Sequence, residues 1–306
     1  MPTKTPLSRY LLILNSVKEN KGISLEELQN KYRREVEFAV QDGELGTDEF
    51  SKRTLQRDMK AIRSLFHIDI GHSKKLKGYT IRSKQYGAEN FERMLEAFDV
   101  FKAMQMGPAF QQIIFPETRK AAGTQYMSLL MHCIPQMQKV EMEYQKFDQE
   151  NSFKRVVNPV ALKEFKNRWY LLAFQDGESL VKTYGLDRIK NLKLLERKFD
   201  PAEAEDWKAK FEYVFGISTD EDAEPQEIVL SFSKQQGKYL KTLHLHPSQK
   251  VILETETETR ISVKLCLTFD LEMELLSHGE ELTVIEPKEL AVRMKNSLSR
   301  ALKNYQ

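Results

Sequence analysis

The chain has few cysteines and no long hydrophobic run. Cys133 and Cys266 are the only cysteines in 306 residues, and they lie far apart without Cys-x-x-Cys spacing. This scarcity argues against a disulfide framework or a zinc finger and fits a reducing cytoplasm. No apolar run approaches the roughly 20 residues of a membrane span, and the first residues lack the apolar core of a signal peptide. We therefore expect a cytoplasmic protein with no membrane partner.

The usual signatures of enzymes are also missing. The sequence contains neither of the two common glycine-rich phosphate-loop patterns, and it has no Gly-x-Ser-x-Gly elbow. Its carboxylates are nowhere paired as a catalytic dyad. His244 and His246 could share one face of a strand and bind a metal with Cys266, but no third ligand has a telling spacing. A metal-dependent enzyme is thus the weakest alternative. We expect no catalytic residues, no metal and no cofactor, and predict that the protein is not an enzyme.

What the chain does have is positive charge at one end. Its formal net charge is only +2, yet residues 51–84 contain ten lysines and arginines against two acidic residues. Such a concentration is typical of nucleic-acid binding, although a merely solvated basic face is the alternative. The length allows two or three domains, and the apolar content of 41% is that of a globular protein.

Three helices are predicted in this amino-terminal region. Apolar residues at helical spacing predict the first over residues 7–17, from Leu7 onward, and Gly22 ends it. Ser24 and Glu27 form a capping box that begins the second. After a polar stretch at residues 42–47, Ser51 offers the N-cap of a third helix. The apolar stripe of that helix comprises Leu55, Met59, Ile62 and Phe66.

The other face of the third helix is polar and basic. Arginine and glutamine near a helix N-terminus can read base edges in the major groove, while amides and lysines hold phosphates. Short strands at 68–70 and 79–81 follow, joined by a basic turn. The order predicts a winged helix-turn-helix that binds double-stranded DNA. Its candidate DNA-binding residues are Ser51, Lys52, Arg53, Thr54, Gln56, Arg57, Lys60, Lys74, Lys75 and Lys77.

A helical connector is expected next, with one helix over 91–104 and another around Leu129 that Pro135 closes. Strands are then predicted at 140–144, 155–162, 168–174 and 180–186. The second of these strands contains Pro159. We therefore expect either that the strand lies at the edge of a sheet or that Pro159 lies at the end of the strand. Asp176-Gly177 predicts a hairpin between the last two, because its turn needs positive φ.

Four features in this order resemble the WYL domain of bacterial transcriptional regulators: Arg155-x-x-x-Pro159, Trp169-Tyr170-Leu171, the hairpin, and Leu186-Asp187-Arg188-Ile189. Residues 54–58 are similar to the recognition helix of the winged regulators that carry this domain. Ser277-His278-Gly279 and residues 284–287 look like the WCX domain that follows it. The resemblance implies an α+β multidomain fold. Its parts are a winged helix-turn-helix (1–84), a helical connector (85–138), a Sm-like β-barrel WYL domain (139–200), a linker (201–224) and a WCX α+β extension (225–306).

The resemblance further implies a basic pocket in the WYL domain that senses an anionic ligand, nucleic acid or a nucleotide. By motif position, its residues are Tyr144, Arg155, Tyr170, Lys182 and Arg188. Family members often have arginine where Lys182 stands. For Tyr170, core packing is an equal alternative, and Arg188 could instead pair with Asp187 or brace the strand end.

The carboxy-terminal part is predicted to be a small α+β sandwich. Strands are expected at 227–232, 250–254, 260–269 and 282–287, with helices at 270–276 and 290–305. In the family this extension packs over the partner's WYL domain, so the resemblance implies a homodimer.

The sequence thus predicts a ligand-responsive, homodimeric transcriptional regulator, a repressor that binds an inverted-repeat operator. The alternative is a nucleic-acid-sensing accessory module that modulates a partner enzyme. It would hold single strands on the central sheet by stacking bases on Tyr144, Tyr170 and Tyr184.

Overall fold

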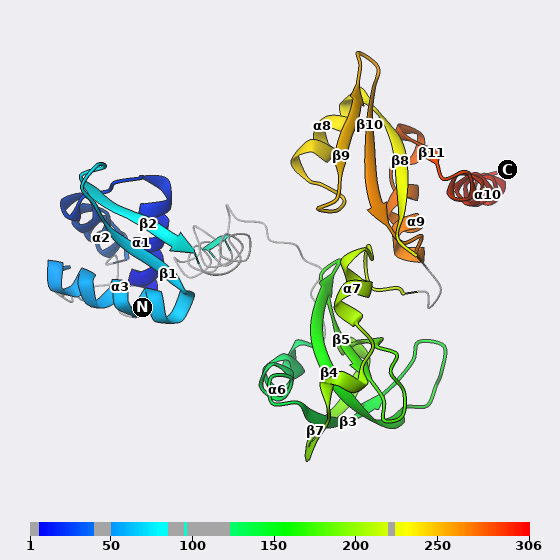
Figure 1. Ribbon diagram of the computed structural model, residues 1–306, viewed down its shortest axis with the longest axis horizontal. Coiled ribbons are helices and arrows are strands. Elements are labelled where there is room, and N and C mark those ends of the chain that lie inside the picture. The colour runs from blue at the N-terminus through cyan, green and yellow to red at the C-terminus, as the bar shows by residue number, and fades with distance from the viewer. Residues whose placement is uncertain (1–5, 40–49, 85–94, 97–122, 220–223) are drawn as a thin grey trace. The chain divides into compact units, whose positions relative to one another are not determined.

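The structure, a computed structural model, describes residues 6–39, 50–84, 95–96, 123–219 and 224–306. The fold is α+β, as predicted, and combines helices with antiparallel sheets (Figure 1). Two compact units, residues 1–118 and 119–306, make up the chain and are described separately. The predicted polar stretch at 42–47 and the predicted helix at 91–104 lie outside the described residues, apart from Leu95 and Glu96.

The first unit contains the three predicted helices and the predicted strand pair. Helices α1 (Pro6–Glu19), α2 (Leu25–Ala39) and α3 (Lys52–Phe66) precede an antiparallel hairpin of β1 (Ile68–Ser73) and β2 (Gly78–Lys84). The helices and the hairpin share one core, and its buried residues include Leu14, Leu28, Leu55, Ile62 and Tyr79. Leu7, predicted on the apolar stripe of the first helix, is 46% exposed and lies outside this core.

Both predicted helix caps are confirmed. The Glu27 amide donates to Ser24 Oγ at 3.1 Å, and the Ser24 amide donates to Glu27 Oε2 at 2.7 Å. At the start of α3, Ser51 Oγ accepts from the Thr54 amide at 3.2 Å. Each cap satisfies amides that the first turn of a helix leaves unpaired.

Gly22 has a second role that the sequence did not indicate. Its φ is +92°, and a Cβ there would lie 2.6 Å from the Leu76 carbonyl oxygen. The Gly22 amide donates to the Tyr79 carbonyl at 3.1 Å, and the Tyr79 amide donates to the Ile23 carbonyl at 2.7 Å. The segment between α1 and α2 therefore pairs with β2, and only glycine allows so close an approach.

The second unit begins with η2 (Thr124–Tyr126) and α6 (Met127–Cys133), followed by a five-stranded sheet. The strand order is β6-β5-β4-β3-β7, antiparallel throughout. The strands are β3 (Gln138–Tyr144), β4 (Phe153–Phe165), β5 (Arg168–Phe174), β6 (Lys182–Gly185) and β7 (Ile189–Lys198). The sequence did not predict β7. The chain enters it through a 3-10 turn, η3 (Leu186–Arg188).

The prediction for Pro159 was wrong. It lies in the middle of β4, which has neighbours on both sides, and not at an edge or a strand end. Residues 153–157 of β4 pair with β3, whereas residues 158–165 pair with β5. Pro159 stands where the strand changes partners and next to an irregularity in the register, so its missing N–H falls where the ladder is already interrupted.

The predicted closed barrel is not confirmed. Within residues 123–219, the outer strands β6 and β7 are not paired with each other, so the sheet stays open. The Tyr144 side chain links β3 to β6 at this opening, because the Gly185 amide donates to Tyr144 Oη at 3.2 Å. The Gln145 amide donates to the Arg188 carbonyl at 3.1 Å, which continues the pairing of β3 with β7.

After η4 (Pro201–Glu203) and α7 (Trp207–Glu212), the chain forms a second sheet with the order β11-β8-β10-β9. Its β-α-β-β-α-β succession with antiparallel neighbours is the ferredoxin-like arrangement. The elements are β8 (Gln226–Ser233), α8 (Lys234–Thr242), β9 (Lys250–Glu254), β10 (Glu258–Leu265), α9 (Phe269–Leu276), η5 (Gly279–Glu281), β11 (Leu282–Glu286) and α10 (Lys288–Lys303).

Two details differ from the prediction for this region. Helix α8 was not expected. The strand predicted over 260–269 ends at Leu265, because Thr268 caps α9 by accepting from the Leu271 amide at 3.3 Å.

Candidate nucleic-acid interface and the basic cluster of the central sheet

Helix α3 presents two distinct faces. Leu55, Asp58 and Ile62 are buried against the first unit, and Met59 packs beside them. The candidate residues Lys52, Arg53, Gln56, Arg57 and Lys60 are exposed. Ser51 and Thr54 are half-buried. Ser51 caps the helix, and its hydroxyl oxygen lies 3.0 Å from that of Thr54.

A buried ion pair holds α3 against α1. Arg9 Nη2 donates to Asp58 Oδ1 at 3.0 Å, and Arg9 Nε donates to Oδ2. The hydrogen bond to Asp58 raises the pKa of Arg9 above its ordinary value. The paired guanidinium and carboxylate fix the orientation of α3, because bidentate pairs have a defined geometry.

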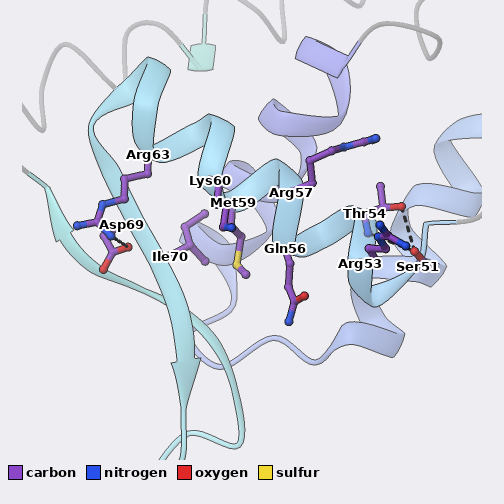
Figure 2. A pocket seen from close by; sticks show the side chains of 10 residues that line it. All are labelled: Ser51, Arg53, Thr54, Gln56, Arg57, Met59, Lys60, Arg63, Asp69 and Ile70. Carbon is purple, nitrogen blue, oxygen red and sulfur yellow. Dashed lines mark hydrogen bonds and ion pairs between the residues drawn. The ribbon is translucent and has the colours of Figure 1, made fainter.

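A groove of about 850 Å³ runs along α3 and β1. Figure 2 shows Ser51 and Arg53 at one end and Arg63 beside Asp69 at the other. The one carboxylate in its lining, Asp69, is 3.7 Å from Arg63 Nη1. The lining residues are Ser51, Arg53, Thr54, Gln56, Arg57, Met59, Lys60, Arg63, Asp69 and Ile70. The groove is therefore strongly cationic, and its guanidinium and amide groups can donate to phosphates and base edges.

The remaining candidate lysines lie in the turn between β1 and β2. Lys74, Lys75 and Lys77 are all exposed there, and Ser73 Oγ accepts from the Leu76 amide at 3.3 Å within the turn. They are not part of the groove lining. Their ammonium groups form a second set of positive charges in the same unit.

The central sheet brings three of the predicted ligand residues into one region, together with Tyr184. The rings of Tyr144 and Tyr184 meet edge to face, with centroids 5.4 Å apart. The Arg188 guanidinium lies 5.2 Å from the Tyr144 centroid and 4.9 Å from that of Phe147. On the other side, Arg155 Nη1 is 3.5 Å from Tyr184 Oη. We call Tyr144, Arg155, Tyr184 and Arg188 the basic cluster.

Neither arginine of the basic cluster is in an ion pair within the described part of the second unit. Asp187, considered as a partner of Arg188, accepts from Arg168 Nη1 at 3.2 Å instead. Arg188 Nε is buried and has no hydrogen-bond partner among the described residues. Because Nε is buried, an anion could approach only the terminal nitrogens of this half-buried guanidinium, whose charge has no ion-pair partner in the described second unit.

Lys182 and Tyr170 are less directly involved. Lys182 Nζ is 2.6 Å from Glu178 Oε2, so its charge is already paired, although Glu178 also lies near enough to Arg155 to be affected by its charge. Tyr170 alternates with Leu171 along β5, whose side chain belongs to the core shared with Tyr184. Tyr170 therefore faces the other side of the sheet. Burial raises the pKa of both Tyr170 and Tyr144, so both hydroxyls remain protonated at neutral pH.

Sequence reasoning missed two contributors. Asp58 reads as another polar residue on an exposed helix face, and no spacing connects it to Arg9, 49 positions earlier. Phe147, 76% exposed and beside Arg188, carries no motif. Both residues lie far in sequence from the arginine named with them, so no local signal could have found these contacts.

Of the two histidines considered for a metal, His246 has other partners. Both lie in the loop before β9, not on a strand. His246 Nε2 is 2.7 Å from the Glu212 carbonyl oxygen, and its Nδ1 is 2.8 Å from Ser248 Oγ. Over the described ranges, no three His, Cys, Asp or Glu residues are placed to hold a metal ion. Among the described helices, none has both the length and the apolar character to cross a bilayer.

Comparisons with known proteins identify the second unit. The WYL domain family matches residues 125–194, and the WCX domain family matches residues 224–302. No curated protein matches the chain. Among solved structures, Proteasome accessory factor B/C (PafBC) of Arthrobacter aurescens is 18% identical with a TM-score of 0.37, over 94% of this chain and 45% of that one. The chain thus spans less than half of that protein.

A structure described as a CRISPR Cas-related protein is 10% identical with a TM-score of 0.39, over 97% of this chain and 82% of that one. At these TM-scores neither similarity supports an argument about fold or function. The two family matches cover the central sheet and the ferredoxin-like sheet. The chain is therefore a WYL-domain protein in which a WCX domain follows the WYL domain.

Proposed function

We propose that this protein is a homodimeric, DNA-binding transcriptional regulator without catalytic activity. In this proposal the first unit is a winged helix-turn-helix and the WYL domain is a Sm-like ligand-sensing module. The observation that carries it is the cationic groove on α3, where Arg53, Arg57 and Lys60 are exposed on a helix with a structured N-cap. The turn lysines between β1 and β2 fit the wing of such a domain.

The DNA-binding role follows from charge and geometry together. A helix whose N-terminal turns carry exposed arginine and glutamine can donate to purine edges in the major groove. Three turn lysines can neutralise phosphates outside the groove. Each copy of the chain offers one such helix, so a twofold dimer would read an inverted repeat. Repression by occlusion requires nothing beyond this binding.

The ligand role rests on the basic cluster. Arg188 lies between two aromatic rings without an ion-pair partner in the described second unit, and Arg155 is close to Tyr184. A phosphate-bearing ligand would pair with these guanidinium groups. To act as a signal, the ligand must bind the DNA-competent and DNA-incompetent states of the dimer with different affinities.

The test is binding of the full chain to duplex DNA from upstream of its own gene. Scrambled duplex and single-stranded DNA are the competitors, at about 0.15 M salt, because low salt exaggerates phosphate contacts. We expect a preference of about a thousandfold for the specific duplex, lost in Arg53→Ala/Arg57→Ala. Arg300→Ala/Lys303→Ala on α10 removes the same charge from exposed positions in the second unit and should leave binding unchanged. Equal binding to every duplex would reject the proposal.

The second candidate is an accessory module that binds single strands through the WYL domain. Phe147 favours it, because this exposed ring beside Arg188 could stack on a base. Tyr144 and Tyr184 argue against it, because they are only 3% and 5% exposed and offer little face for stacking. Stronger binding to single strands than to any duplex, lost in Phe147→Ala, would favour this candidate.

A further inference from the structure

Strand β9 is an outer strand of the WCX sheet with an unusual surface. It pairs with β10 on one side, and all five of its residues are exposed. The strand forms one edge of this sheet (Figure 1). Its three consecutive apolar residues Val251, Ile252 and Leu253 are 44%, 53% and 38% exposed. An edge strand also presents unpaired backbone N–H and C=O groups to which another strand can add.

Proteins usually protect such an edge with proline, with charges inside the strand, with a β-bulge or with a covering element. β9 contains no proline, and its charged residues stand at its two ends. Within the described residues, β10 is the one strand that pairs with it. A register shift at Ile252 is the one such device in this strand. It leaves all three apolar side chains exposed, so a covering strand would still remove apolar surface from water.

The sequence of β9 is complementary to itself in the antiparallel direction. Lys-Val-Ile-Leu-Glu centred on Ile252 places Lys250 opposite the partner's Glu254, and Val251 opposite the partner's Leu253. At each end Lys250 would then lie beside the partner's Glu254, a carboxylate that already pairs with Lys241 of its own chain and can accept a second ammonium group. The centre would bring two isoleucines together. Opposite charges and apolar pairs are the cross-strand combinations that stabilise antiparallel pairing.

The neighbouring helix extends the same surface. Lys241 of α8 is 2.5 Å from Glu254 of β9, so the end of the helix lies beside the strand. Tyr239 and Leu243 near that end are 63% and 80% exposed. A twofold axis through an antiparallel strand pair is perpendicular to the sheet, so both copies of α8 would lie on the same face. Their exposed apolar side chains would add to the contact.

We propose that a second copy of this chain pairs with the first through β9, joining the two WCX sheets into one continuous antiparallel sheet. The proposal names a surface for the homodimer of the proposed function and rests on that dimer, but not on DNA binding.

The first test places a cysteine on the expected twofold axis. Opposed residues in an antiparallel pair have Cα atoms about 4.5–5.5 Å apart, which is within the range that a disulfide spans. Ile252→Cys should therefore form a covalent dimer of the full chain under mild oxidation. Ile285→Cys is the matched control, because Ile285 is exposed at a register shift in β11, the other outer strand. The native cysteines are both buried. An Ile252→Cys chain that does not crosslink, or crosslinks no better than the control, would overturn the proposal.

The second test measures the oligomeric state by sedimentation. Ile252→Lys would put two like charges opposite each other, so we expect the dimer dissociation constant to rise about tenfold or more. Ile285→Lys should leave it unchanged. A wild-type chain that is monomeric at tens of micromolar, or a dimer that both lysine variants preserve equally, would reject β9 as the interface.

The two proposals can fail separately. If the chain binds its operator as a dimer but the Ile252→Cys variant does not crosslink, the regulatory function stands and this interface is rejected. If the Ile252→Cys variant crosslinks but the chain binds no specific duplex, the interface stands and the regulatory function is rejected. A β9 surface that takes a strand from a different protein would leave the purified chain monomeric, which also rejects the proposal.

Discussion

Arg9 and Asp58 form a bidentate ion pair in the core of the first unit, with Arg9 Nη2 3.0 Å from Asp58 Oδ1. The Asp58 side chain is fully buried, and Arg9 is only 8% exposed. Asp58 sits on α3 between residues that face the groove, so this pair connects the proposed recognition helix to α1. Burying two charges is tolerated only while each has its partner.

We expect Asp58→Ala to destabilise the first unit by roughly 3–5 kcal/mol, because it leaves the Arg9 charge buried and unpaired. Hydrogen exchange of the α1 and α3 amides in the full chain would measure the loss. Arg9→Met/Asp58→Leu, which removes both charges and keeps apolar volume, should recover most of it. A single variant with unchanged exchange, or a double variant as unstable as the single, would contradict the role given to this pair.

Arg57 and Lys75 should affect DNA binding in different ways. Arg57 lines the groove on α3, and its loss should relax sequence preference by about 1–3 kcal/mol. Lys75 lies in the turn and should contact phosphate only. Lys75→Ala should therefore weaken binding to all duplexes alike and lower the slope of log K against log salt by about one. Fluorescence anisotropy at several salt concentrations separates the two, and a specificity loss in Lys75→Ala would refute the assignment.

The hydrogen-bond partners of Asp176 should determine the pH at which its carboxylate becomes protonated. Lys139 Nζ lies 2.6 Å from Asp176 Oδ1, and Asn158 Nδ2 donates to the same oxygen at 3.0 Å. These hydrogen bonds lower the pKa of Asp176 below its ordinary value, with that from Lys139 the largest cause. A lowered folded-state pKa contributes stability that is present above the unfolded-state pKa of about 3.9 and is lost as the pH falls through the folded-state pKa.

The effect on stability should be small because the Asp176 side chain is 57% exposed. The pKa itself is the sharper measurement. In an NMR titration of the carboxyl carbon, Lys139→Met should raise the pKa of Asp176 toward its ordinary value. Lys190→Met, which replaces an exposed lysine elsewhere in the same domain, should not. An Asp176 pKa that does not change in Lys139→Met would mean that the ion pair does not persist in solution.

The local signals in the sequence predicted much of the fold. Ser24 and Ser51 are side chains that can cap only the helix immediately after them, so short-range reasoning found both helix starts. The apolar strand 168–174 was equally clear, because it is buried on both faces. By contrast, α8 has a buried glycine, Gly237, and one buried leucine, Leu240, in nine residues. That pattern is too sparse for an apolar stripe. The helix is stabilised by its Ser233 cap, which accepts from the Gln236 amide at 3.3 Å, and by tertiary packing.

Long-range relationships were not accessible from the sequence. The prediction for Pro159 assumed that a strand keeps the same neighbouring strands along its whole length. Instead, β4 pairs with β3 up to residue 157 and with β5 from residue 158 onward. In the candidate site, the motif placed Tyr144, Arg155 and Arg188 close together, whereas the burial of Asp58 depends on Arg9 in a different helix. A charged residue on a polar helix face is read as exposed unless its partner is known.

Tyr144 connects the basic cluster to the backbone at the opening between β6 and β7. Its hydroxyl accepts from the buried Gly185 amide at 3.2 Å. Tyr144→Phe would leave that amide without a partner, and we expect the WYL domain to lose roughly 1–3 kcal/mol of stability. Fluorescence of Trp169 in β5 during chemical denaturation would measure the loss.

Tyr126→Phe provides the matched control, because the Tyr126 hydroxyl donates to the exposed Lys190 carbonyl at 2.8 Å and water can replace it. It should cost less than Tyr144→Phe. Because burial raises the pKa of Tyr144, the stability it provides should be constant at neutral pH and below. That stability should decline only as the pH rises from about 10 through the raised folded-state pKa. Equal losses in the two variants would show that the Gly185 amide has another partner in solution and that Tyr144 does not bridge the open sheet.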